Sequence, residues 1–151
     1  MAGVTYQQEF LDSVIPEIKP LLEDHWKEIA NHKDKIGLNP DWVTYKSLEA
    51  DGGLKIFTAR SGGNLIGYFV VVVNRGLHYR DHLFATNDVI FLTKEYRNTG
   101  LGHKLIEFAE KCLSEDGVTV LAINTKVSHP FDGLMGQMDY RLTERVYTKV
   151  L

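Results

Sequence analysis

The chain has 151 residues, of which 44% are hydrophobic and 25% charged, and its formal net charge is −3 at pH 7. These values predict one folded domain over residues 1–151 with a single core, and they exclude a disordered or fibrous protein. The acidic balance argues against general nucleic-acid binding, and the only cysteine, Cys112, excludes a disulfide framework. The longest apolar run, residues 65–73, is too short to span a bilayer, and the first residues lack the pattern of a secretory leader. We therefore expect a cytoplasmic protein that does not act at a membrane.

The first elements in the chain are predicted to be a strand and a helix. Residues 4–10 suit a short strand, with Asp12 or Ser13 as the cap of the following helix. Apolar residues then recur every three or four positions over residues 15–29, which favours an amphipathic helix. Because proline removes a backbone donor, Pro20 either kinks this helix or marks its true start.

The Asn39-Pro40 pair predicts a second helix, with asparagine as the cap and proline in the first turn. This helix should end at the Asp51-Gly52-Gly53 segment and turn three residues inward: Trp42, Tyr45 and Leu48.

The middle of the chain predicts a sheet. Residues 54–59 and 65–73 flank a Ser-Gly-Gly-Asn turn and should form a hairpin. The second of these strands is apolar at nearly every position, so we expect it to be central and covered on both faces. A polar excursion over residues 74–82 should then lead to a third strand at about residues 83–92.

The most informative stretch of the sequence runs over residues 89–113. It predicts a buried strand (89–92), a turn rich in small residues (97–103), and a helix with one apolar face. A turn of this kind lets backbone N–H groups approach a ligand, and a helix N-terminus adds free donors and a positive dipole end. The stretch therefore predicts an anion-binding cradle.

The C-terminal third predicts an apolar strand at residues 118–123 and an irregular or short helical segment over residues 125–138. Residues 140–150 alternate apolar and polar side chains, which is typical of a last strand with one solvated face. The whole element order predicts an α/β (α+β) fold with a mixed, mostly antiparallel central sheet flanked by helices.

The turn itself has the form R-x-x-G-x-G. It does not match the phosphate-binding loop of the G-x-x-x-x-G-K-S/T type, and the dinucleotide fingerprint would need a third glycine where this chain has Leu105. Together with its strand V-I-F-L, its helix G-L-G-H-K-L and the order of the elements, the turn resembles the GCN5-related N-acetyltransferase (GNAT) superfamily. The resemblance covers essentially the whole chain.

The resemblance implies acetyl-CoA as the cosubstrate, with no metal. In that superfamily the backbone amides of the turn bind the pyrophosphate of the coenzyme, and the preceding strand pairs with its pantetheine arm. This implies that Phe91 and Leu92 contact pantetheine, and that Asn124 contacts the coenzyme arm as well. The implied phosphate cradle consists of Arg97, Asn98, Thr99, Gly100, Leu101, Gly102 and His103.

An amine acceptor such as lysine must lose a proton before it attacks a thioester, which costs about 4.6 kcal/mol at pH 7. A base acting directly or through water is therefore expected. Asp88 is the first candidate, because it precedes the V-I-F-L strand where many members of the superfamily carry a carboxylate. The alternative is a surface or turn aspartate.

His78 and His82 are further catalytic candidates, since the polar excursion that holds them should overhang the substrate side. The alternative is a solvated loop. Their four-residue spacing would suit metal ligands only on a helix, which this segment does not favour, so no metal site is expected.

The sequence departs from the pattern of the superfamily at the position of the general acid. Members typically place a tyrosine in the last helix, where it protonates the departing thiolate. Here Met135 stands at that position, and methionine cannot donate a proton. Either Tyr147, Tyr140 or His129 serves instead, or coenzyme A leaves as a thiolate.

The function that follows is an acetyl-CoA-dependent N-acetyltransferase, an acyltransferase that modifies a primary amine of a small molecule or a protein by direct attack. The acceptor is not readable from the sequence, and a homodimer stays open. The alternative is a binding module that keeps the fold and the coenzyme but acts through a macromolecular partner. Trp26, Trp42 and Tyr45 suit either core packing or the border of the acceptor groove.

Overall fold

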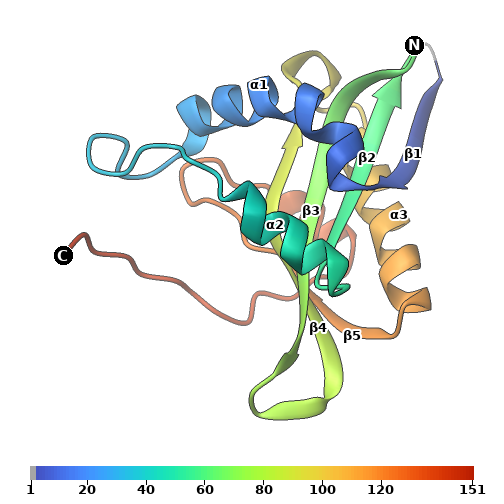
Figure 1. Cartoon of the computed structure of the whole chain (residues 1–151), viewed down its shortest axis with the longest axis vertical. Helices are drawn as coiled ribbons and strands as arrows, with labels where there is room; N and C mark the ends of the chain where they lie inside the picture. Colours follow the sequence, from blue (N-terminus) through green and yellow to red (C-terminus); the bar gives the residue numbers. More distant parts are fainter. Residues whose placement is uncertain (1–2) are drawn as a thin grey trace.

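A computed structural model describes residues 3–151 (Figure 1). These residues form a five-stranded sheet of order β1-β2-β3-β4-β5, in which β5 is parallel to β4 and every other pair is antiparallel. The mixed, mostly antiparallel sheet predicted from the sequence is therefore confirmed. The strands are β1 (Val4–Glu9), β2 (Leu54–Ser61), β3 (Asn64–Gly76), β4 (Tyr79–Leu92) and β5 (Val118–Ala122).

Helices cover both faces of the sheet. On one face, α1 (Leu11–Ile29) and α2 (Trp42–Ala50) pack over a core that includes residues of β2, β3 and β4. On the other face, α3 (Leu101–Glu115) packs over a second core built on the same strands (Figure 1). A short α4 (Asp132–Gln137) follows β5. No helix within residues 3–151 is long and apolar enough to cross a membrane.

β3 is the central strand because both of its faces are apolar. Val70 faces the α1 and α2 core and is 4% exposed, while Val71 faces the α3 core and is fully buried. A strand buried on both sides gains hydrophobic stabilisation at consecutive positions rather than at alternate ones.

The starts of the two N-terminal helices differ from the prediction. α1 begins at Leu11, and Phe10 is its N-cap without a side-chain hydrogen bond, so Asp12 and Ser13 do not cap it. Instead the Leu11 amide donates to the Glu49 carboxylate of α2 at 2.8 Å. A donor at a helix end can be satisfied by a distant element, which no local pattern reveals.

α1 also continues through Pro20, so this residue is not its start. α2 begins at Trp42, two residues after the predicted Asn39-Pro40 start, because Asp41 is the residue that caps it. The Asp41 carboxylate accepts a hydrogen bond from the Thr44 amide at 3.0 Å, as expected of an N-cap aspartate.

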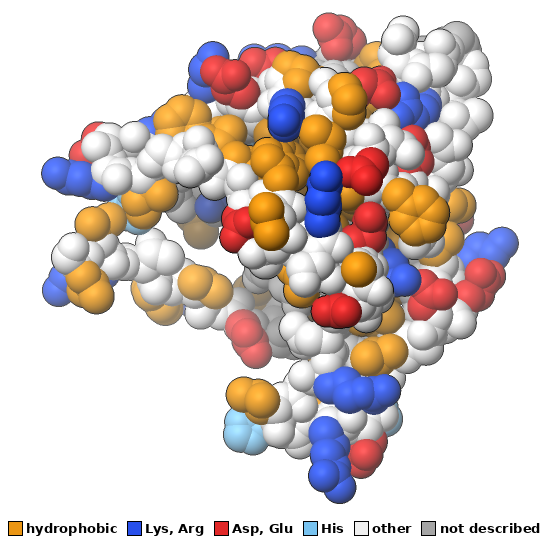
Figure 2. Space-filling view, in the orientation of Figure 1, with side chains coloured by type: hydrophobic (Ala, Val, Ile, Leu, Met, Phe, Trp, Pro, Cys, Tyr) orange, Lys and Arg blue, Asp and Glu red, His pale blue; other side chains and the backbone are white. Residues whose placement is uncertain are grey.

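The prediction of a polar excursion over residues 74–82 is also wrong, because almost all of these residues belong to the β3–β4 hairpin. β3 and β4 pair as far as Gly76 and Tyr79, which leaves only a two-residue turn. β2 stops pairing with β3 at Val72, and β5 meets β4 only from Leu83 onward. Within residues 3–151, this outer ribbon therefore has no neighbouring strand on either side. Its polar side chains are solvated on both faces, and charged residues gather at this end of the molecule (Figure 2).

The last predicted strand is wrong. Residues 139–151 form no helix or strand and run away from β5 as an extended segment (Figure 1). Residues 140–150 do alternate apolar and polar side chains, but a strand also needs a partner edge, and the sequence pattern does not supply one.

Candidate active site

β4 and β5 separate part of the way along their length. Their pairing ends at Thr86 and Ala122, while β4 continues to Leu92. At the point of separation, the Asn87 side chain donates to the Asn124 carbonyl at 3.1 Å and accepts from the Asn124 amide at 2.7 Å. These two hydrogen bonds are hereafter called the Asn87 lock. Beyond it, residues 88–92 of β4 form an edge that does not pair with β5. Such an edge can take up an extended ligand as an additional strand.

The turn at the end of this edge has several free backbone donors. Asn98 and Gly100 have φ angles of 59° and 83°, and Gly100 is the N-cap of α3. Within the described chain, no hydrogen bond is donated by the backbone amides of residues 98–103, and the first helical bond runs from Lys104 to Gly100 at 3.2 Å. Consecutive free N–H groups at a helix N-terminus form an anion-binding site. These six residues are hereafter called the amide turn.

Arg97 supports this turn with its side chain. Its guanidinium donates to the Leu92 carbonyl at 2.7 Å and to both carboxylate oxygens of Glu28 at 2.6 and 3.1 Å. These hydrogen bonds hold the pKa of Glu28 below its usual range. Arg97 thus connects α1 to the turn, and its donors are largely used within the protein. A phosphate contact from the Arg97 side chain would therefore have to compete with Glu28.

The two residues expected beside pantetheine lie on β4 with their side chains on opposite faces. Phe91 is 7% exposed, with its ring 4.9 Å from that of His25 and 5.5 Å from that of Tyr68. Leu92 packs against the α3 core. Since the Phe91 side chain is buried, this residue can meet a ligand chiefly through its backbone.

The other residues of the implied cradle have different surroundings. Leu101 is 5% exposed and anchors the start of α3 in the core. The Thr99 hydroxyl donates to the Tyr96 carbonyl at 2.5 Å, which tightens the turn. His103 lies 3.2 Å from the Glu107 carboxylate, one helical turn further on. Their backbone amides, rather than their side chains, are therefore the shared feature.

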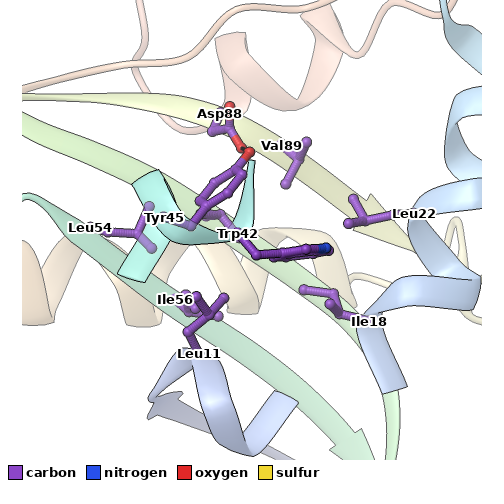
Figure 3. Close-up of a pocket in the computed structure, with 10 residues that line it drawn as sticks. Leu11, Ile18, Leu22, Trp42, Tyr45, Leu54, Ile56, Asp88 and Val89 are labelled. Atoms are coloured by element: carbon purple, nitrogen blue, oxygen red, sulfur yellow. Dashed lines mark hydrogen bonds between the residues drawn. The ribbon is translucent and has the colours of Figure 1, made fainter. Parts of the chain in front are cut away.

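Asp88 occupies a bulge in β4. Val70 pairs with Val89 and Val71 pairs with Asn87, so that Asp88 has no partner in β3. A bulge redirects the side chain of the extra residue, and here the Asp88 carboxylate accepts a hydrogen bond from the Tyr45 hydroxyl at 2.5 Å (Figure 3). Burial and the nearby carboxylate raise the pKa of Tyr45. Tyr45 therefore stays protonated and orients Asp88 at the base of the open edge.

A small cavity adjoins Tyr45 and Asp88, and a larger groove adjoins that cavity. A cavity of about 20 Å³, enough for one water molecule, is lined by Tyr45, Asp88 and apolar side chains that include Leu22 and Trp42 (Figure 3). Leu22 and Trp42 also border a groove of about 430 Å³ between α1 and the segment before α2. That volume lies within the range of small-molecule sites. The groove, hereafter the aromatic groove, is lined by Lys19, Leu22, Glu23, Trp26, Leu38, Pro40 and Trp42.

His25 was not anticipated from the sequence. It lies on the buried face of α1, 9% exposed, against the Phe91 ring. Burial lowers its pKa to about 4, so the ring is neutral at pH 7. Its place seven residues after the buried Ile18 is the signal that could have found it, because both positions fall on one helix face.

Three of the predicted catalytic residues are not brought to Asp88. His82 precedes Asp88 on β4 by six residues, or roughly 20 Å of strand, and contacts Thr119 at 3.2 Å. His78 lies in the turn at the tip of the ribbon, beside Tyr79. Tyr147 is 87% exposed in the C-terminal segment. Among residues 3–151, no group of three His, Cys, Asp or Glu side chains could hold a metal ion.

The position of the missing tyrosine and the two remaining candidates for the general acid have different surroundings. Met135 lies in α4, where it offers no hydroxyl. The Tyr140 hydroxyl donates to Glu110 at 2.8 Å, and burial and this carboxylate raise the pKa of Tyr140. His129 is exposed and contacts Ser128 at 3.0 Å.

The mixed sheet, the open edge of β4 and the amide turn agree with the resemblance to the GNAT superfamily noted in the sequence. Residues 16–131 match the acetyltransferase (GNAT) family. Since this match covers most of the chain, the chain belongs to that family and is an N-acetyltransferase. No protein of curated function matches the sequence.

Solved structures with the same fold cover nearly all of the chain. The ribosomal-protein-alanine N-acetyltransferase from Brucella melitensis biovar Abortus 2308 has 19% identity and a TM-score of 0.71, with 99% of each chain covered. Aminoglycoside N-acetyltransferase AAC(6')-Iy in complex with CoA has 15% identity and a TM-score of 0.75, with 100% of this chain and 96% of that chain covered. An aminoglycoside acetyltransferase from an uncultured soil metagenomic sample, in complex with sisomicin, has 14% identity and a TM-score of 0.70, with 97% of each covered. At these identities the likeness shows the fold alone.

Proposed function

We propose that the chain transfers the acetyl group of acetyl-CoA to a primary amine by direct attack, in the gap between β4 and β5. The observation that carries this proposal is the amide turn, whose free donors lie at the end of the unpaired edge of β4. An AAC(6')-Iy structure of the same fold was solved with CoA, which supports coenzyme A as the carrier.

In this proposal the coenzyme lies along β4. Its pyrophosphate accepts hydrogen bonds from the amides of residues 98–103, where the dipole of α3 also favours negative charge. Its pantetheine arm runs along residues 88–92 as an added strand. The Asn124 amide already donates to Asn87 and its carbonyl accepts from Asn87, so the Asn124 side chain is the group proposed to contact the arm.

Asp88 is the proposed base. It lies where the gap begins, its carboxylate is exposed, and Tyr45 holds it in place. The amine loses a proton to Asp88, directly or through a water in the adjoining cavity, and its nitrogen attacks the thioester carbonyl. The C–N bond forms and the C–S bond breaks, the attacking nitrogen releases its second proton to solvent as the amide forms, and coenzyme A leaves as a thiolate. Positioning of the reactants supplies most of the rate.

The aromatic groove is the proposed entrance for the acceptor. It adjoins the cavity beside Asp88 through Leu22 and Trp42, and the Lys19 ammonium already lies 5.6 Å from the centre of the Trp42 ring. The groove also holds the Trp26 ring and the Glu23 carboxylate, which both attract a cation, so a cationic amine suits this groove. Proteins of the same fold act on aminoglycosides and on a ribosomal protein by name, and both classes offer cationic amines.

Two measurements test the proposal. Calorimetric titration of acetyl-CoA should give binding, and a thiol-release assay should give steady turnover with at least one of four acceptors: a lysine peptide, a peptide with a free N-terminus, a polyamine or an amino sugar. Absence of acetyl-CoA binding would refute the coenzyme assignment. Binding without turnover across this panel would instead contradict the catalytic assignment.

The second candidate is a module that binds the coenzyme without catalysis. The observation that favours it is the lack of a free hydroxyl at Met135, while Tyr140 is bound to Glu110. Steady turnover with any of the acceptors removes this candidate.

A further inference from the structure

The aromatic groove contains a cation that the protein itself does not neutralise. Lys19 of α1 lines this groove, and its ammonium lies 5.6 Å from the centre of the Trp42 ring. Among residues 3–151, no carboxylate forms an ion pair with Lys19. A cation without a counter-ion in a groove of ligand size attracts a negatively charged group of the ligand.

The carboxylates of α1 are bound to other cations. Glu23, which also lines the groove, lies 3.3 Å from the ammonium of Lys27. Three more carboxylates of this helix have cationic partners on other elements: Asp12 with Lys46, Glu17 with Arg60, and Glu28 with Arg97. The fifth, Asp24, is five residues from Lys19 and therefore lies about 140° away around the helix. The positive charge of Lys19 is thus left for the groove.

Lys19 stands at the end of the groove that is nearest to Asp88. Ile18, its neighbour in the sequence, lines the cavity beside Asp88, and Trp42 lines both this cavity and the groove. Figure 3 shows the Trp42 side chain next to Ile18. From Lys19 the groove follows α1 to Trp26, seven residues further on, which is about 10 Å of helix. This length corresponds to about three residues of an extended peptide.

We propose that the acceptor is the N-terminus of a peptide or protein with an acidic side chain at its first or second residue, and that Lys19 selects it. The inference depends on the acetyl transfer proposed above and names its acceptor. The reacting amine lies at Asp88, the acidic side chain accepts a hydrogen bond from Lys19, and the next residue packs against Trp26, Leu38 and Pro40. Lys19 is then a residue that determines specificity.

The groove suits a chain that continues into solvent. The Glu23 side chain is 62% exposed and Leu38 is 41% exposed, so the lining is open along its length. The Trp26 and Leu38 side chains offer apolar contacts, while the Lys19 charge repels an acceptor that carries a second cation at this place. A polyamine or an amino sugar with several amines is therefore disfavoured.

Proton loss also favours an N-terminal amine over a lysine side chain. With a reference pKa of about 7.7 to 8.0, roughly one N-terminal amine in ten is neutral at pH 7. With a reference pKa of about 10.4, only about one lysine amine in 2,500 is neutral. In addition, an N-terminal amine lies next to its own first side chains, so Lys19 can reach their carboxylates while the amine is at Asp88.

A thiol-release assay on matched peptides tests the selection. Two peptides of six residues with amidated C-termini, Ala-Asp-Leu-Gly-Gly-Gly and Asp-Ala-Leu-Gly-Gly-Gly, are each compared with the version that has asparagine in place of aspartate. For at least one pair, kcat/KM should be ten or more times higher with aspartate. The inference is overturned if neither pair shows this preference, or if a polyamine is a better acceptor than all four peptides.

Variants of Lys19 assign the preference to this side chain. Lys19→Gln should raise KM for the preferred aspartate peptide by about 10- to 100-fold, the usual value of a hydrogen bond to a charged group, and leave kcat nearly unchanged. Lys19→Glu should reverse the preference, so that asparagine becomes better than aspartate. Lys46→Gln is the matched control, because this exposed lysine of α2 does not line the groove, and it should keep the wild-type preference. A preference that survives in Lys19→Gln would overturn the inference.

Calorimetry with coenzyme A present separates the two levels of the proposal. The preferred aspartate peptide should bind at least ten times more tightly than its asparagine version, and Lys19→Gln should remove the difference. A peptide that binds with this preference but is never acetylated would refute the acetyl transfer and retain the recognition by Lys19. Equal affinities in a chain that acetylates any acceptor would overturn the inference and leave the acetyl transfer intact.

Discussion

The two ends of the unpaired β4 edge are built in different ways. At one end, the amide turn offers consecutive backbone donors from a single stretch of chain, shaped by positive φ angles at Asn98 and Gly100. At the other end, Asp88 is oriented by Tyr45, which comes from a helix 43 residues earlier. A backbone site needs particular small residues at fixed spacing, whereas a side-chain site needs only that the fold bring distant residues together. The backbone site can therefore stay specific for one ligand, while substitutions at the side-chain site change which acceptor is used.

The largest expected effect comes from the acceptor end. Asp88→Asn should lower kcat by about 10²- to 10⁴-fold, the usual contribution of a general base, and leave acetyl-CoA affinity unchanged. Turnover and calorimetry on the same samples measure both. Asp81→Asn, on the exposed ribbon, is the control and should keep full activity. Equal loss of coenzyme affinity in Asp88→Asn would show that the two ends are not independent.

The next effect belongs to the turn end. Gly100→Val should weaken acetyl-CoA binding by about 100-fold, because a side chain at φ 83° displaces the turn and forfeits about two charge-assisted hydrogen bonds. Gly63→Val is a matched control, since Gly63 has the same φ of 83° and open space around it but lies in the β2–β3 turn. Both variants should lose similar stability, measured by urea unfolding. Similar coenzyme affinities in the two variants would contradict the assignment of the turn.

A smaller effect concerns His25, which packs on Phe91 beneath the open edge. Because the folded pKa of about 4 lies below the unfolded value near 6.5, the unfolded chain binds the proton first. Stability should therefore fall as the pH drops from 6.5 toward 4, by about 2 kcal/mol after partial screening by solvent. His25→Leu should remove this slope in urea unfolding, and His78→Leu should retain it. An unchanged slope in His25→Leu would assign the pH dependence to other groups.

The smallest effect tests the link between α1 and the turn. Glu28→Gln should destabilise the fold by about 1 kcal/mol at pH 7 and weaken coenzyme binding a few-fold, since Arg97 loses its partner. The folded pKa of Glu28 is lowered, so its contribution is present above the usual carboxylate pKa and is lost as the pH falls through the lower folded value.

Urea unfolding at pH 7 and pH 3 should thus show that the difference in the free energy of unfolding between wild type and Glu28→Gln becomes smaller at the lower pH. Glu23→Gln breaks an exposed pair with Lys27 on the same helix and should change stability by less than about 0.5 kcal/mol. A gap that does not depend on pH would exclude the ion pair as its cause.

The sequence predicted the elements that depend on local residue patterns. The strand, turn and helix over residues 89–113 formed as expected, because a strand followed by glycines and an amphipathic helix leaves few alternatives. The central place of β3 followed from its continuous apolar run. Contacts between distant elements were not readable. Examples are the Glu49 carboxylate at the start of α1, the Asn87 lock on Asn124, and the Tyr45 hydroxyl on Asp88.

The two wrong strand assignments show a second limit. Residues 74–82 looked like a loop because they are polar, yet a ribbon without neighbouring strands can be polar on both faces. Residues 140–150 looked like a strand because they alternate, yet no edge of the described chain accepts them. The alternation of apolar and polar residues specifies which side chains share a face. Whether the segment pairs as a strand depends on a neighbouring strand, which lies elsewhere in the chain or outside it.

The hydrogen bonds between Asn87 and Asn124 also fix the length of the candidate site. They fix where β4 and β5 part, so the open edge always spans residues 88–92, or about 17 Å of strand. In the proposed binding mode, a carrier whose phosphates are held at one end would present its sulfur beside Asp88 only if its arm matched that length. A longer or shorter thioester carrier would bind the same turn and place its acyl group out of reach. Donor selection would thus come from distance, without any side chain that recognises the acyl group itself.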